Sequence, residues 1–308
     1  MGLYQRRQLR AAVSLLLYPF AFAVLLTFTA KLLFGGRPTS PPPPVTAPSH
    51  GSPEHQPGVI SKALVVASTK NDDTAWLSEI PPALNWTVYH YRVDDPITPA
   101  LSVPSRKGNE AMVYLTYIID NYHSLPDLIF FHHGHPRAWH QKLTSAEEVA
   151  RLRPGYVLRA GYASARCLPG CENVVPLEGG EPAPSMAALP LMSRRDHLVT
   201  LLENFLEPAR FPELEGAVPR QLAAPCCAQF AVSRDRVLRR EREWWLKLRE
   251  WLIEAPLPSM NSGRLMEHLW HVWFGVEAVH CPSLEACQCH VFGLGDNCES
   301  YFEQEKYM

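Results

Sequence analysis

The chain has 308 residues, of which 19% are charged, and a formal net charge of −2 at pH 7. This balance gives no basic surface field, so it excludes nucleic acid as a partner. Aromatic residues make up 10% of the chain and include eight tryptophans, which argues against a largely disordered protein.

Residues 11–34 predict a single membrane-spanning helix. Residues 11–30 contain no charged side chain, and a helix of that length spans the bilayer's hydrocarbon core of about 30 Å. Three arginines among residues 1–10 favour a cytoplasmic N-terminal tail. We therefore expect a type II membrane protein of the secretory pathway, in the Golgi or endoplasmic reticulum. The alternative is a cleaved signal peptide, whose apolar region is usually shorter.

Residues 35–60 are rich in proline, with four consecutive prolines at 41–44. Such a segment favours polyproline II and cannot pack a core, so we interpret it as a spacer. A PxxP ligand is the alternative, but cytoplasmic adaptor domains could not reach a lumenal stem. Residues 61–308 then form a lumenal globular domain, long enough for one sizeable core.

The lumenal region carries an even number of cysteines, as a disulfide framework requires. They are Cys167, Cys171, Cys226, Cys227, Cys281, Cys287, Cys289 and Cys298. Their spacing does not reveal the pairing, and nearby histidines leave a zinc site in the C-terminal tail as an alternative. The sequence Asn85-Trp86-Thr87 predicts N-glycosylation at Asn85.

Strand and helix patterns alternate in the first half of the domain. Residues 63–68 and 128–131 are short apolar runs that predict buried strands, and residues 86–91 alternate as another strand. Residues 106–127 carry apolar side chains at helical spacing and predict a helix. Alternation of this kind is typical of the α/β class, with a mostly parallel sheet flanked by helices.

The second half is predicted to contain fewer strands. We expect, in chain order, a long loop over 167–192, a helix over 194–206, a strand over 227–232, an amphipathic helix over 237–255 and a last helix over 264–274.

Four histidines follow the apolar run at 128–131, and they predict a site. His133 and His135 are two positions apart, so on a strand they share one face. At the carboxyl edge of a parallel sheet, where ligands bind, they could ligate Zn²⁺ or Mn²⁺ together with His140, or donate to a diphosphate. The alternative is a structural pair of hydrogen-bonded histidines.

Charged residues at element ends predict a donor-binding site for phosphate groups. Arg106 and Lys107 precede a helix whose N-terminal amides favour anions. Asp73 follows the first strand, where α/β folds contact nucleotides, although a plain turn is the alternative. Ser233 and Arg234 end the strand predicted at 227–232 and could face the substrate.

Glu267 and His271 predict the catalytic pair. They are four positions apart, and on a continuous helix they would share a face. A carboxylate beside an imidazole can act as a general base on a hydroxyl group. The alternative is a structural pair. We interpret Glu110 as a first-turn charge that stabilises its helix rather than as a catalytic acid.

Several segments together resemble a mainly fungal family of unknown function. Its recurring patterns are KGxEA, YLTYIIDNYxSLPD, FxHGHxxxWH, CCAQFAVSR and SGRxxEHLWHxxFG, found here at Lys107–Ala111, Tyr114–Asp127, Phe131–His140, Cys226–Arg234 and Ser262–Gly275. The order of parts is also distantly similar to GT-A-type glycosyltransferases, which implies a nucleotide-sugar donor. Histidines stand here where those enzymes carry the DxD metal motif.

We therefore expect a membrane-anchored, glycosyltransferase-like enzyme. Its partners would be the lipid bilayer through residues 11–34, a nucleotide sugar, and a glycan or protein acceptor, with Mn²⁺ or Zn²⁺ as the candidate cofactor. The first alternative is a metal-dependent hydrolase built on the histidines. The second is a non-catalytic lumenal binding module in which the histidines are structural.

Overall fold

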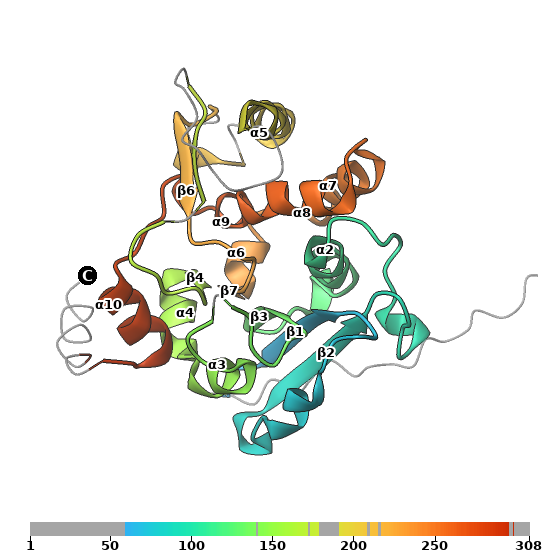
Figure 1. Cartoon of the computed structure of the whole chain (residues 1–308), viewed down its shortest axis with the longest axis vertical. Helices are drawn as coiled ribbons and strands as arrows, with labels where there is room; N and C mark the ends of the chain where they lie inside the picture. The colour runs from blue at the N-terminus through green and yellow to red at the C-terminus, as the bar shows by residue number, and fades with distance from the viewer. Residues whose placement is uncertain are drawn as a thin grey trace, which may run out of the picture. The chain divides into compact units, whose positions relative to one another are not determined.

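A five-stranded sheet organises the described part of the chain (Figure 1). The computed structural model describes residues 59–139, 141–171, 173–178, 191–207, 210–214, 217–295 and 298. They all belong to the compact unit Glu54–Met308. None of the helices within these ranges is long and apolar enough to cross a membrane. The spanning segment and stem predicted over 11–34 and 35–60 lie outside the described residues, apart from positions 59 and 60.

The strands of this sheet are β1 (Lys62–Ser68), β2 (Trp86–Arg92), β3 (Leu128–His133), β4 (Tyr162–Ser164) and β7 (Phe230–Ser233). They lie in the order β2-β1-β3-β7-β4. β1 pairs in parallel with β2 and β3, whereas β7 is antiparallel to both β3 and β4. Every strand but β7 therefore points the same way, which confirms the predicted α/β class with a mostly parallel sheet. The carboxyl ends of β1, β3 and β4 share one edge, and β7 begins there.

Helices cover both faces of the sheet, because alternate strand residues are apolar on each side. One face packs under α2 (Glu110–Asp120), α5 (Leu191–Phe205), α7 (Arg242–Glu254), α8 (Ser259–Glu267) and α9 (Trp270–Trp273). The other face packs on α3 (Ser145–Arg151), α4 (Pro154–Ala160), α10 (Leu284–Cys287) and the π-helical turn η6 (Gln288–Phe292). Figure 1 shows α2 and α7 to α9 on one side of β1 and β3, with α3 and α4 on the other.

Shorter elements complete the domain. An antiparallel pair, β5 (Asn173–Pro176) and β6 (Gln221–Ala224), forms a second sheet. The remaining short helices are η1 (Ala75–Glu79), η2 (Pro82–Leu84), η3 (Pro99–Leu101), η4 (Tyr122–Ser124), η5 (Pro212–Leu214) and α6 (Arg234–Val237). β5 lies inside the stretch 167–192 that was predicted to be a loop, so that prediction was wrong for these four residues.

Several predicted elements begin or end at other residues in the structure. For two of them, the backbone conformation explains the difference. The helix predicted over 106–127 begins only at Glu110, because Gly108 and Asn109 have φ of 73° and 52°. The strand predicted over 227–232 begins at Phe230, because Cys227 and Ala228 also have positive φ. The helix predicted over 237–255 begins only at Arg242, as α7, after the separate short helix α6, and the helix predicted over 264–274 is divided into α8 and α9.

All eight cysteines are paired in disulfides, which confirms the predicted framework. The pairs are Cys167–Cys287, Cys171–Cys281, Cys226–Cys227 and Cys289–Cys298. No thiolate is left to bind zinc in the C-terminal tail, so the zinc alternative there was wrong. Asn85 is exposed at a left-handed turn before β2, where its glycosylation stays a prediction.

Candidate functional site

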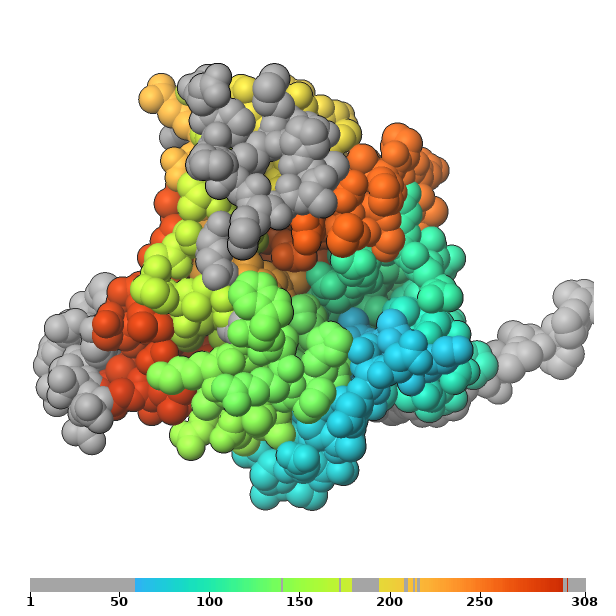
Figure 2. All heavy atoms as spheres, viewed as in Figure 1, coloured from blue at the N-terminus to red at the C-terminus, as the bar shows by residue number. Residues whose placement is uncertain are grey.

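A polar cleft of about 390 Å³ lies at the carboxyl ends of β1 and β3, beside the start of α2. Its lining includes Ser68, Asp72, Arg106, Glu110, His133 and His135. On the face seen in Figure 2, the segment that follows β3 (green) lies between the segment that follows β1 (light blue) and the C-terminal segment (red). The structure therefore brings together residues from three separate parts of the sequence, at the edge where α/β proteins bind ligands.

The cleft combines several groups that attract anions. Arg106 is exposed in its wall, and the backbone N–H groups at the start of α2 face the same region. The imidazole rings of His133 and His135 lie 6.4 Å apart, centre to centre. The Nδ1 atom of His135 lies 3.2 Å from Oδ1 of Asp72, which holds this exposed ring at the cleft. A diphosphate is a ligand of matching chemistry.

Close packing shapes the segment that carries these histidines. Gly134 lies so near the end of β1 that a Cβ atom there would come within 2.5 Å of the Cβ of Ser68. The indole Nε1 of Trp76 donates to the Gly134 carbonyl at 2.7 Å. These contacts fix where the chain leaves β3, and so they fix the two imidazoles on either side of Gly134.

The histidine and carboxylate side chains of the cleft do not by themselves form a metal site. Among the described residues, no three His, Cys, Asp or Glu side chains are placed to hold one metal ion. His140, predicted as a third ligand, lies outside the described residues. His133, His135 and Asp72 therefore supply no complete protein-held site for Mn²⁺ or Zn²⁺, and the chemistry of the cleft has to be derived from its own side chains.

Two glutamates near the start of α2 influence each other electrostatically: Glu110 lines the cleft, and Glu267, at the end of α8, lines a separate crevice near the start of β7. Burial, and then the negative charge of Glu267, raise the pKa of Glu110 to about 8. Burial raises the pKa of Glu267 as well, but Arg264, the backbone N–H of Cys227 and Arg194 oppose that rise. Because these groups stabilise the ionised form of Glu267, Glu110 holds the proton near neutral pH. Two carboxyl groups with such different surroundings can act as an acid and a base.

His271 differs from its predicted role. Glu267 is the last residue of α8 and His271 lies in α9, so they do not share one continuous helix. Both line a small crevice near the start of β7. The imidazole of His271 is buried, its Nε2 donates to the Ala278 carbonyl at 3.2 Å, and burial lowers its pKa to about 4. The geometry of His271 fits a neutral, structural side chain. Glu267 lines the same crevice and acts on Glu110 through its charge.

The structure does not bring the other predicted donor-binding residues to the cleft. The ammonium group of Lys107 donates to the carbonyls of Ile253 and Ala255, at the C-terminal end of α7. Asp73 accepts a hydrogen bond from the Ala75 amide in an exposed turn. The basic side chain of Lys107 therefore caps a helix, which is a common use of a cation.

Ser233 and Arg234 lie at the opposite edge of the sheet. Ser233 pairs with Leu128, the first residue of β3, and Arg234 forms an ion pair with Asp127 at 3.0 Å. Because β7 is antiparallel to β3, its end lies at the edge where β3 begins. The same antiparallel direction brings residues 226–229, which precede β7, to the sheet edge where β3 ends, and Cys226, Ala228 and Gln229 line the crevice of Glu267 there.

A buried polar network supports the end of β3 on the face opposite His133. The Nε2 atom of His132 lies 2.9 Å from Glu148, which also accepts from Gln141 at 2.8 Å. The Gln229 amide contacts the same imidazole at 3.1 Å. His132 is fully buried in this network, so it supports the end of β3 and does not line the cleft.

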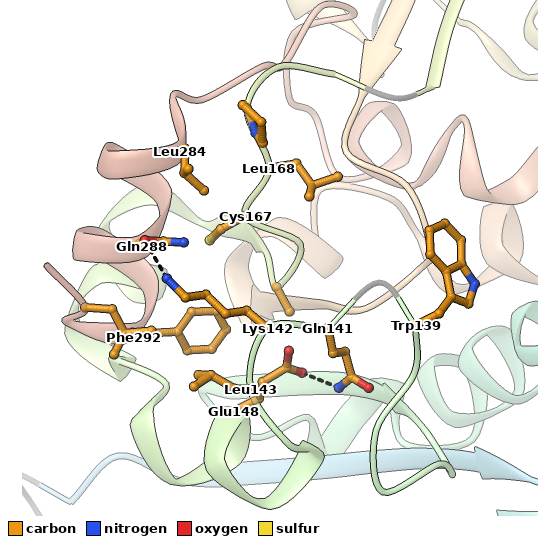
Figure 3. Close-up of a pocket in the computed structure, with 13 residues that line it drawn as sticks. Trp139, Gln141, Lys142, Leu143, Glu148, Cys167, Leu168, Leu284, Gln288 and Phe292 are labelled. Carbon is orange, nitrogen blue, oxygen red and sulfur yellow. Dashed lines mark hydrogen bonds between the residues drawn. The ribbon is translucent and has the colours of Figure 1, made fainter.

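A second hollow, of about 360 Å³, lies at the same sheet edge on the side of α3 and α10. Figure 3 shows Leu168, Leu284 and Phe292 around the hydrogen-bonded side chains of Lys142 and Gln288. Trp139 also lines this hollow and is 85% exposed. The two hollows lie on either side of the segment after β3, which carries His135 and Trp139.

Sequence reasoning missed two parts of this site. Glu110 was interpreted as a helix-stabilising charge, yet its side chain lines the cleft, and the charge of Glu267 helps to raise its pKa. A carboxylate directly before nine consecutive buried residues, 111–119, was the available signal. The adjacent cysteines at 226 and 227 were expected to join a disulfide framework, but no sequence pattern showed that they pair with each other beside Glu267.

These features define a disulfide-bonded α/β domain with a polar, acid-containing cleft at the carboxyl edge of its sheet. A family model described as a protein of unknown function (DUF3431) matches residues 64–290, and the chain belongs to this family. No curated protein and no solved structure matches the chain significantly.

Proposed function

We propose that the protein is a glycosyltransferase-like enzyme that takes a nucleotide-sugar donor in the cleft of β1, β3 and α2. The observation that carries the proposal is the presence, in one cleft, of anion-binding groups and of Glu110, a carboxyl group whose pKa is raised by burial and by the charge of Glu267. Arg106, His133, His135 and the α2 amides can bind a diphosphate, and Glu110 lines the same cleft. The charge of Glu267 acts on Glu110 from the end of α8. The distant similarity of the order of parts to GT-A-type enzymes agrees with this choice of donor.

The chemistry follows from the protonation of the carboxyl pair. In transfer, the bond between the anomeric carbon and the diphosphate oxygen breaks, and an acceptor hydroxyl oxygen bonds to that carbon. The hydroxyl proton passes to Glu110, which lines the cleft, and Glu110 gives its own proton to the ionised carboxylate of Glu267, whose charge acts on it. Arg264 and Arg194 favour the ionised form of Glu267 beforehand. Arg106 and the imidazoles stabilise the negative charge that develops on the departing diphosphate.

The second hollow is the proposed place of the acceptor. It opens at the same edge of the sheet, and it combines apolar side chains with the polar ends of Lys142 and Gln288. Such a mixed lining suits a carbohydrate, which has both hydroxyl groups and apolar C–H faces. Trp139 is an exposed aromatic residue at the same hollow, with the Arg166 guanidinium over its ring at 5.3 Å.

A metal-dependent hydrolase is the less favoured function, because no three-ligand group exists among the described side chains. A non-catalytic binding module remains an outcome of the test below.

The test is a thermal-shift screen of the purified full-length protein with UDP-, GDP- and CMP-sugars, with and without Mn²⁺. A donor at a hundred times its dissociation constant stabilises the folded state by about 2.7 kcal/mol. For a domain of this size that raises the melting temperature by roughly 5–10 °C.

Two matched arginine variants connect the response to the cleft. Arg106→Ala should remove the shift, whereas Arg234→Ala, at the opposite edge of the sheet, should keep it. No shift with any donor would refute nucleotide-sugar binding. A shift without transfer to glycan or protein acceptors would favour the binding module.

We propose further that the enzyme acts from a membrane, with its domain in the lumen of the secretory pathway. The support is the uncharged run within residues 11–34, the basic tail before it, the disulfides and the exposed sequon at Asn85. Resistance of the expressed protein to alkaline extraction, and a mobility shift with an endoglycosidase that is lost in Asn85→Gln, are the expected results. Release by alkali would refute the anchor.

A further inference from the structure

The second hollow contains a buried carboxyl group with one oxygen that has no partner. Glu148 lines this hollow, although only 3% of its surface is exposed. Its Oε2 atom accepts from the amide of Gln141 at 2.8 Å and lies 2.9 Å from Nε2 of His132. No described residue donates a hydrogen bond to the other oxygen, Oε1, and Figure 3 shows that oxygen directed into the hollow. A buried acceptor in this position needs a donor from outside the protein.

The surrounding hydrogen bonds fix the orientation of the Glu148 side chain. The amide oxygen of Gln141 accepts from the backbone N–H of Ala138 at 2.5 Å, so the NH₂ group of Gln141 faces Glu148. On the other side, one proton joins Nε2 of His132 to Oε2, whichever of the two atoms holds it. Oε1 therefore carries no hydrogen, and it can only accept a hydrogen bond.

The opening of the hollow offers a group of the opposite kind. The exposed ammonium group of Lys142 lines the hollow and donates to Gln288 at 3.4 Å, which leaves two of its N–H groups for a ligand. Most of the remaining wall is apolar. A ligand that fits must therefore donate to Glu148, accept from Lys142 and present apolar surface to the walls. A sugar meets all three needs, because its hydroxyl groups both donate and accept and its C–H faces are apolar.

Charged compounds match this hollow less well. An amine only donates, and its positive charge would meet Lys142 and the guanidinium of Arg166, which lies over the ring of Trp139 at 5.3 Å. A carboxylate only accepts, so it cannot donate to Oε1 of Glu148. The arrangement of donors and acceptors thus favours a neutral compound that carries hydroxyl groups.

We propose that Glu148 is a specificity-determining residue that accepts a hydrogen bond from one hydroxyl group of a neutral carbohydrate in the second hollow. The inference rests on the proposed function, which places the acceptor there, and it narrows that acceptor to a neutral glycan. Glu148 recognises the hydroxyl group, while the proton transfer of the proposed function stays with Glu110. Donor binding in the cleft of β1, β3 and α2 does not involve Glu148, so each proposal can fail without the other.

The test is saturation-transfer NMR of the purified full-length protein with methyl glycosides of the neutral hexoses and pentoses. Glucosamine and glucuronic acid are the charged comparisons. Glu148→Gln keeps the shape of the side chain, but its amide oxygen should turn toward Gln141 and leave an NH₂ group facing the hollow. Because a hydrogen bond to a carboxylate is then lost, binding of the neutral glycoside should weaken about tenfold or more.

The neighbouring glutamate provides the matched control. Glu147 is exposed, does not line the hollow, and accepts from Thr144 in the N-terminal cap of α3. Glutamine also forms such a cap, so Glu147→Gln removes one negative charge beside Glu148 at little structural cost. Its affinity for the glycoside should equal that of the wild type.

Deoxyfluoro glycosides separate recognition by Glu148 from a purely structural role. Fluorine in place of a hydroxyl group cannot donate a hydrogen bond. At one ring position this replacement should weaken binding to the wild type about tenfold, and it should leave binding to Glu148→Gln unchanged. If Glu148 only supported the fold, the replacement would weaken binding to both proteins by the same factor, and that result would overturn the proposal.

A second variant covers the case in which Glu148→Gln does not fold. Leu284→Trp places a larger side chain on the wall formed by α10, outside the hydrogen bonds of Glu148, and should abolish binding. Unchanged affinity in either variant, tighter binding of the amino sugar, or no binding of any neutral glycoside would overturn the inference. The nucleotide-sugar response, measured on the same protein, shows separately whether the proposed function stands.

Discussion

Glu110→Gln is the substitution that most directly tests whether Glu110 is held protonated near neutral pH. In the folded protein the pKa of Glu110 is about 8, whereas the ordinary value is 4.5. Between these two values the folded state holds a proton that the unfolded state has released. The contribution of Glu110 to stability is therefore complete below pH 4.5 and is lost as the pH rises through about 8.

The size of the effect follows from the width of this interval. One pH unit corresponds to about 1.4 kcal/mol, and the side chain is partly exposed to the cleft, so we expect a loss on the order of 3 kcal/mol between pH 5 and pH 8. Glutamine has the shape of the protonated side chain and does not titrate. At pH 8 the variant should therefore melt roughly 6–12 °C above the wild type, while at pH 5 the two should agree closely.

The assay is a set of thermal denaturation curves for both proteins between pH 5 and pH 8.5. Glu250→Gln is the matched control, because Glu250 is an exposed glutamate in the middle of α7. It should leave the pH dependence of stability unchanged. The reasoning that Glu110 is held protonated would be refuted if the melting temperatures of Glu110→Gln and wild type changed equally with pH. A variant less stable than the wild type at pH 8 would refute it as well.

Three further outcomes follow from the buried groups. His132→Ala leaves the buried carboxylate of Glu148 without its imidazole partner. It should lower the free energy of unfolding, measured by chemical denaturation, by about 3 kcal/mol, and His132→Gln should recover part of this loss. Gly108→Ala places a Cβ 2.6 Å from a leucine of α7 at a positive φ, and should cost about 2 kcal/mol in the same assay. Burial lowers the pKa of His268 and His271 to about 3 and 4, so in the Glu110→Gln background stability should fall as the pH drops from 6.5 toward 4; a flat pH profile would contradict this.

Local sequence patterns were enough to predict the sheet strands of the first half. The apolar runs at 63–68 and 128–131 became β1 and β3, because short runs of this kind form strands that are buried on both faces. The same positions placed His133 and His135 at a strand end, and the structure puts both in the cleft. The disulfide framework was likewise predictable, since it depends on cysteine count and compartment rather than on geometry.

The predicted residues Ser233 and Arg234 show where the sequence became insufficient. Their position at the end of a strand was nearly correct, but no local pattern gives the direction of a strand within its sheet. β7 is antiparallel to β3, so these residues end at the opposite edge. Lys107 was also placed correctly at the start of a helix, but the carbonyls that it caps belong to residues far away in the chain.

Composition, hydrophobic periodicity and cysteine count thus determined the α/β class, the predicted anchor and stem, and the expectation of disulfides. Each of these features is a property of a short stretch of sequence, so a short stretch is enough to predict it. Tertiary structure alone decided that the charge of Glu267 acts on Glu110, that Cys226 bonds to Cys227, and that one of four clustered histidines is a buried support. Each of these depends on contacts between segments far apart in sequence, or on a backbone conformation that such contacts stabilise.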